Sequence, residues 1–170
     1  MTRDSLNALE SSIALLEQGL DLLRVLADGD YRECPPGRSS VGAQYRHVLD
    51  HYRALVDGIE EARVDYDARR RNVEVETDRD VAGRDTGLLI ERLGALDCTP
   101  YDTPLQVVAA CSAQAPGEPQ PSSLGRELHF LVSHTVHHYA IIKLLLASAE
   151  KVPCDFGVAP STVAWQRSAH

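Results

Sequence analysis

Hydrophobic residues recur at three- and four-residue steps in four segments of the chain, and this spacing predicts four amphipathic helices. In the first segment, leucines and Ile13 form the apolar series. Ser39 or Ser40 is placed to cap the second helix, and Thr77 to open the third. The predicted helices run from near Asp4 or Ser5 to about Ala27, from Val41 to about Glu61, from about Asp78 to Leu96, and from just after Ser122 or Ser123 to about Glu150.

The segments between these helices differ in character. Residues 62–76 are charged and lack a sustained period, which predicts a long connection. Prolines exclude a helix between residues 99 and 122, where residues 105–110 are expected to form a short strand or one arm of a small hairpin. The end of the chain is expected to be extended and to pack back on the helices through Phe156, Val158 and Trp165.

Together these patterns predict an all-α fold: a four-helix bundle with a short extended or hairpin segment before the last helix and an extended C-terminal tail. At 170 residues the chain is expected to form a single domain over residues 1–170. We expect it to be cytoplasmic, because it lacks a membrane-spanning stretch and a signal-peptide pattern. Its four cysteines contain no CxxC pair, which excludes a zinc ribbon and a thioredoxin-type motif.

The charge balance argues against nucleic acid as a partner. The formal net charge is −8, from 25 acidic and 17 basic residues, and such a surface repels a phosphate backbone. The densest basic run, Arg69-Arg70-Arg71, lies among acidic residues and is interpreted as a solvated connector. We therefore expect no nucleic-acid partner, and the absence of a membrane-spanning stretch predicts no membrane partner.

Candidate chemistry comes from the histidines, because six of the seven fall in two predicted helices. A helical projection of the fourth helix puts His134 and His138 in the middle of its apolar stripe. In the second helix His51 lies closer to the apolar side than His47 does. The remaining two lie outward on the fourth helix, His137 near the edge of the stripe and His129 toward solvent.

Buried imidazoles without partners are costly, and this favours a metal ion between the two helices. Each unpartnered polar group costs a few kcal/mol to bury, on the order of 1–3. His134 and His138, at i and i+4, can bind one ion from one helix, and a third histidine from a facing helix would leave coordination positions open. The alternative, in which the histidines only hydrogen-bond within the core, stays open at this point.

Two segments resemble the DinB-like (YfiT-type) family of metal-dependent helical bundles. Residues 40–47, Ser-Val-Gly-Ala-Gln-Tyr-Arg-His, are similar to the stretch that ends in the family's first metal histidine, and residues 134–138 are similar to its closing HxxxH. Residues 156–162 resemble the tail of an uncharacterised branch. The chain departs from the family where Tyr139-Ala140-Ile141 replaces Arg-Gly-Gln and where Ser39 replaces a tryptophan.

The resemblance implies a divalent transition metal (zinc, nickel or iron) held by His47, His134 and His138, with His51 supporting these ligands or acting as an additional ligand. It also implies a homodimer. Members of this fold include S-transferases that use low-molecular-weight thiols, so the first hypothesis is a metal-dependent, thiol-dependent transferase, or a hydrolase, with an open three-histidine site. Its candidate supporting groups are Gln44, Glu127 and Tyr139.

The alternative hypothesis is a non-catalytic metal-binding or stress-response protein that acts as a dimer. It predicts a closed site of four ligands, with His51 or Glu127 completing the coordination sphere.

Overall fold

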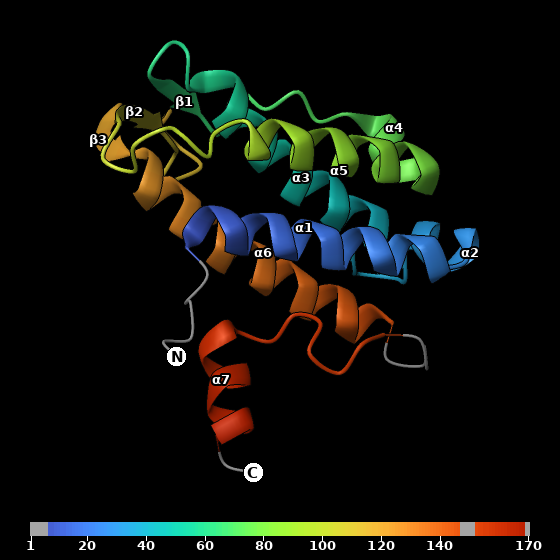
Figure 1. The fold of residues 1–170 in the computed structure, drawn as a ribbon. Coiled ribbons are helices and arrows are strands. Elements are labelled where there is room, and N and C mark those ends of the chain that lie inside the picture. Colours follow the sequence, from blue (N-terminus) through green and yellow to red (C-terminus); the bar gives the residue numbers. More distant parts are fainter. Residues whose placement is uncertain (1–6, 147–151, 169–170) are drawn as a thin grey trace.

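The computed structural model describes residues 7–146 and 152–168, and most of these residues are helical, as predicted. Four long helices make up the body (Figure 1): α1 lies against α5 and α6, and α3 packs against the same two helices. A small sheet lies at one end of them (Figure 1). The elements are α1 (Ala8–Val25), α2 (Asp28–Arg32), α3 (Val41–Gly58), β1 (Arg63–Asp65), α4 (Val73–Thr77), α5 (Arg79–Gly94), β2 (Pro104–Val108), β3 (Gln120–Ser123), α6 (Leu124–Leu145) and α7 (Pro160–Ser168).

Two predicted helix caps are confirmed, and both stand at the start of helices that carry histidines. The Ser40 hydroxyl accepts the backbone N–H of Ala43 at 3.0 Å, and α3 begins at the next residue. Ser123 caps α6 by accepting the backbone N–H of Arg126. Each hydroxyl satisfies one of the N–H groups that have no partner within the helix.

The starts of α1 and α5 differ from prediction. Asn7 and Glu10 form a reciprocal capping box, so α1 begins at Ala8, whereas the predicted caps near residues 4 and 5 lie outside the described residues. At α5 the cap is Asp78, whose carboxylate accepts two backbone N–H groups, rather than Thr77. A carboxylate also complements the positive end of the helix dipole.

The long connection predicted over residues 62–76 joins α3 to α5, and it contains two short elements that its charged sequence did not indicate, β1 and most of α4. Strand β1 pairs in parallel with β2, which aligns Val64 with Val107. The hairpin predicted before the last helix is confirmed: β2 and β3 are antiparallel, and Leu105 faces Ser122. Val64 is the single buried residue of β1 and packs in the core. Because charged residues flank it, no pattern in the sequence indicated that this segment is a strand.

For the end of the chain, the predicted packing of Phe156 is confirmed, and the predicted extended conformation of residues 160–168 is wrong. Phe156 is fully buried and stacks on Tyr139 with ring centroids 4.4 Å apart. Residues 160–168, however, form α7 instead of an extended tail, and no residue of this helix is buried. Trp165 is 69% exposed and does not pack as predicted. Helix α6 ends at Leu145, and the predicted end at Glu150 lies outside the described residues.

Tyrosines hold α1, α3 and α6 together on the side of the core next to α1. Tyr45 donates its hydroxyl to the Gly19 carbonyl at 2.9 Å, and Tyr139 donates to the Leu15 carbonyl at 3.0 Å. Gly19 permits this contact, because a Cβ at that position would lie 2.0 Å from the Tyr139 oxygen.

Within the described residues, no helix has the length and apolar content needed to cross a membrane.

Candidate metal centre

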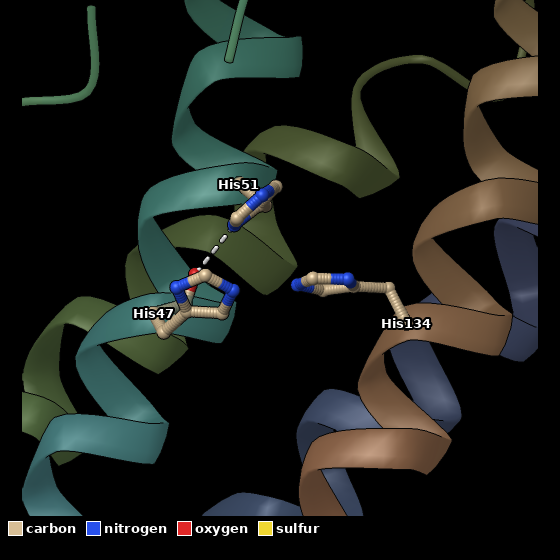
Figure 2. Close-up of side chains that lie close together, drawn as sticks. All are labelled: His47, His51 and His134. Atoms are coloured by element: carbon tan, nitrogen blue, oxygen red, sulfur yellow. Dashed lines mark hydrogen bonds between the residues drawn. The ribbon is translucent and has the colours of Figure 1, made fainter. Parts of the chain in front are cut away.

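Four histidine rings from α3 and α6 converge between the two helices. Figure 2 shows the rings of His47, His51 and His134 directed toward one another from the two helices. One nitrogen of each of these three lies within 4.8 Å of the other two. The His138 ring completes the cluster, with its centroid 4.4 Å from that of His47 and 4.5 Å from that of His134.

The cluster lies at the boundary of the core. His134 and His138 are partly exposed, whereas Thr135 and Tyr139, the next residue along in each case, are buried. The prediction that the pair occupies the middle of the buried stripe is therefore wrong, because the stripe runs through Thr135 and Tyr139. On α3, His51 is 4% exposed and lies deeper than His47, as predicted. His129 and His137 are exposed.

Burial keeps the four imidazoles neutral. It lowers the pKa of His47, His51 and His134 from 6.5 to about 3, and that of His138 to about 4. Repulsion between the histidines adds to this effect, and the Arg69 guanidinium also lowers the pKa of His47 and His134. Neutral imidazoles are the form that binds a metal ion, so the cluster is ready for metal at neutral pH.

The hydrogen bonds determine the tautomer of His51. Its Nδ1 lies 2.7 Å from the carbonyl oxygen of His47 and must donate, because a carbonyl can only accept (Figure 2). Its Nε2 lies 2.6 Å from Nη1 of Arg69 and must accept, because a guanidinium can only donate. Both ring nitrogens of His51 are therefore engaged by the protein.

His138 and His134 differ from His51 in having a nitrogen to offer. Nδ1 of His138 lies 2.6 Å from Oε1 of Gln44 and donates to it, which leaves the lone pair on Nε2. Such a bond is the usual way a protein orients a metal-binding imidazole. Nε2 of His134 is buried and has no hydrogen-bond partner among the described residues. The donor set suits a transition metal, and the unpartnered nitrogen identifies where an ion would satisfy the protein.

Of the three candidate supporting groups, the structure brings only Gln44 into contact with the histidines. Glu127 is fully buried, but its carboxylate accepts hydrogen bonds from Tyr66 at 2.9 Å, from Ser122 and from Arg126 at 2.8 Å. It joins α6 to β3 and to the segment after β1. Tyr139 faces α1, away from the cluster, where its hydroxyl is bonded to a backbone carbonyl.

Two aromatic residues flank the cluster. Tyr66 stacks against His51 with ring centroids 5.3 Å apart, and Phe130 lies 5.3 Å from His134. They also contact each other at 5.5 Å. Phe130 stands four residues before His134 on α6, so its position followed from helical spacing, whereas Tyr66 lies in a segment without a period. The wall they form shields one side of the histidines from water.

Arg69 is the main residue beside the histidine cluster that the sequence analysis missed. It belongs to the basic run interpreted as a solvated connector, which is wrong for this residue, because it is partly buried and bonded to His51. Arg70, its neighbour, is exposed as expected. A sequence of three arginines carries no signal that distinguishes the inward-facing one.

Comparisons with known proteins identify the family of the chain. The family model of the DinB superfamily matches residues 14–142. "FK506-binding protein 5" of Rhizopus delemar is 31% identical over 158 residues, which are 91% of this chain and 37% of that protein. The chain thus spans little more than a third of the length of this curated relative. No solved structure matches the chain. Because the family match covers most of its length, the chain belongs to the DinB superfamily.

Proposed function

We propose that the protein binds one divalent transition metal (zinc, nickel or iron) through His47, His134 and His138, and uses it in a thiol-dependent transfer reaction. The observation that carries the proposal is the buried Nε2 of His134, which lacks a partner among the described residues and faces the other histidines. An unpartnered buried acceptor is costly, and a metal ion removes that cost.

The choice of ligands follows from which nitrogens are free. His138 has Nε2 available, because Gln44 holds its Nδ1, and neither ring nitrogen of His47 is hydrogen-bonded in the described part of the chain. His51 would have to release Arg69 before it could bind an ion. Three histidines leave coordination positions open, as catalytic sites require.

The chain's own residues prepare the site for a small thiol. A bound ion would supply Lewis acidity, lowering the pKa of a thiol at an open position so that its thiolate forms near neutral pH. Gln44 fixes the orientation of His138, and Phe130 and Tyr66 shield one side of the cluster from water. Low-molecular-weight thiols of the cytoplasm are the expected substrates, and the expected assembly is a homodimer.

The test begins with elemental analysis of protein purified without an affinity tag. We expect about one metal ion per chain, lost in His134→Ala. Incubation of the loaded protein with small thiols and the electrophile monochlorobimane should then accelerate conjugation. Absence of metal from the wild-type protein would rule out the site, and metal without acceleration by any thiol would rule out the transferase.

A second candidate is a non-catalytic metal-binding protein with a closed site. The grouping of His47, His51 and His134 within 4.8 Å favours it, because His51 could serve as a further ligand. Replacing His51 discriminates between the two candidates. In the open site His51→Ala keeps a full equivalent of metal and His138→Ala loses it, whereas in the closed site both variants weaken binding to a similar degree.

A further inference from the structure

Arg69 brings a positive charge to the edge of the metal centre. It lies in the connection between β1 and α4, is partly buried, and donates from Nη1 to Nε2 of His51 at 2.6 Å. The His51 ring that receives this bond is itself held in place, because its Nδ1 is bonded to the His47 carbonyl and its face stacks on Tyr66. Arg69 is therefore tied to a fixed part of the site.

The Arg69 guanidinium has donors to spare. A guanidinium has five N–H groups in a planar fork, and one bond to an imidazole uses only one of them. Elsewhere in the described residues, arginines near the cluster are paired with carboxylates: Arg46 with Glu76, and Arg53 with Asp50 and Asp85. Arg69 forms no ion pair within residues 7–146 and 152–168.

Three aspartates that share a cavity with Arg69 are engaged by other groups. Arg69 lines a cavity of about 230 Å³ whose lining contains no histidine and includes Asp50, Asp57, Asp65 and Glu61. Asp50 is paired with Arg53, and Asp57 with Arg92. The Asp65 carboxylate accepts the backbone N–H groups of the two residues before Arg69. None of these carboxylates forms an ion pair with Arg69 in the described residues, so its guanidinium keeps N–H groups that could bind an anion at the metal centre.

We propose that Arg69 binds the carboxylate of the small molecule that reaches this centre, so that the thiol substrate is anionic. A guanidinium fork matches a carboxylate in a bidentate arrangement, and a partly desolvated pair of this kind is stronger than a neutral hydrogen bond. The inference rests on the proposed function, since the carboxylate is placed on the thiol that the centre would hold.

The test uses the cobalt(II)-loaded full chain and three thiols that differ in the terminal group: 3-mercaptopropionate, 2-mercaptoethanol and 2-mercaptoethylamine. Binding is followed by the change in visible absorption on titration. The expected order is carboxylate, then hydroxyl, then ammonium, with 3-mercaptopropionate at least about ten-fold tighter than 2-mercaptoethanol, as a charge-assisted bond provides. Equal affinities for these two thiols would overturn the inference.

Variants assign the preference to one residue. Arg69→Gln should bring the ratio of the 3-mercaptopropionate and 2-mercaptoethanol affinities to within about two-fold, while the chain still binds one cobalt ion. Arg70→Gln removes the same charge at the exposed neighbour and should keep the full preference. If Arg69→Gln does not fold, Arg69→Lys decides, because it keeps the charge, loses the fork and should retain only a few-fold preference.

Two failures are distinguishable. If cobalt does not bind, or if no thiol changes the spectrum, the proposed function fails and the inference falls with it. If the thiols bind but Arg69→Gln keeps the full carboxylate preference, the metal centre stands and the role of Arg69 is wrong.

Discussion

His138 and Tyr139 are neighbours on α6, yet they serve two different faces of the helix. Tyr139 turns toward α1, where its hydroxyl donates to the Leu15 carbonyl. His138 turns toward α3, where Gln44 engages one ring nitrogen and leaves the other free. On the tyrosine face buried polar groups find partners in the backbone, whereas on the histidine face a buried nitrogen of His134 has none among the described residues. The contrast separates groups whose hydrogen bonds join the helices from groups that keep a nitrogen free to bind a ligand.

The same physical effect acts on both faces with opposite consequences. Burial raises the pKa of Tyr45 and Tyr139 and lowers the pKa of His134 and His138, so all four groups are neutral. A neutral tyrosine needs one acceptor, and a helix carbonyl provides it. A neutral imidazole keeps a lone pair that needs a donor or a metal ion. Stability tests should therefore probe the tyrosine face, and metal and proton tests the histidine face.

The largest expected effect is acid destabilisation of the metal-free protein through the histidine face. Folded-state pKa values of about 3 to 4, against the ordinary 6.5, mean that unfolding takes up protons below pH 6.5. The contribution of the four histidines to the free energy of unfolding is therefore fully present above pH 6.5, and it is lost as the pH falls toward 3 to 4. We expect the unfolding constant to rise by at least about a hundred-fold between pH 6.5 and 4.5, measured by urea unfolding at fixed pH values.

His134→Gln provides the control for this effect. It removes one of the four titrating groups, so the proton uptake on unfolding near pH 5 should fall from about four to about three. A pH dependence unchanged by this substitution would show that carboxyl groups, and not the histidine cluster, cause the acid lability.

The next effect tests the tyrosine face. Gly19→Ala would place a methyl group 2.0 Å from the Tyr139 oxygen and 2.9 Å from its ring, which forces the helices apart. We expect a loss of about 2 kcal/mol in the free energy of unfolding, with the metal content unchanged. Gly87→Ala in α5 is the matched control, since no atom lies within 4 Å of the new methyl group. Helix propensity should make it neutral or stabilising by up to about 1 kcal/mol. Equal effects of the two substitutions would contradict the close packing of α1 on α6.

Helical spacing and caps carried most of the prediction from sequence. The hydroxyls at Ser40 and Ser123 marked the starts of α3 and α6, and the i, i+4 histidines on these helices face one another because both helices are long and adjacent. Periodicity is a local property of the sequence, so it predicts which side of a helix a residue occupies. It does not say which neighbouring helix that side will meet, and this is why His134 was placed too deep.

What the sequence did not reveal depends on contacts between distant segments. Strand β1 has one buried residue, Val64, and forms only because β2 is there to pair with it. Tyr66 and Arg69 reach the histidines because this pairing fixes where the chain leaves the sheet. Glu127 was a candidate for the site, but Tyr66 and Ser122, which hold it elsewhere, could not be identified as its partners from spacing.

A smaller effect is expected when the support of one ligand is removed. Gln44→Ala leaves Nδ1 of His138 without its acceptor, so the ring is no longer held in the orientation that offers Nε2. We expect metal affinity to fall by about ten-fold, as for other groups that orient a metal-binding imidazole, measured by competition with a chelator. Gln44→Glu keeps an acceptor and should bind metal at least as tightly as the wild type. Weakened binding in both variants would contradict the orienting role.

The smallest effect should come from Tyr139→Phe, and it tests whether the two faces of α6 are independent. The substitution removes the hydroxyl that donates to Leu15 but keeps the ring that stacks on Phe156. We expect a loss of about 1 kcal/mol in the free energy of unfolding, the usual contribution of one buried hydrogen bond. Metal affinity should stay within about two-fold, because sites without shared partners act additively. The double variant with Gln44→Ala should therefore show the sum of the two single effects. A ten-fold loss of metal affinity in Tyr139→Phe alone would show that the tyrosine packing positions His138, and the two faces would then be one site.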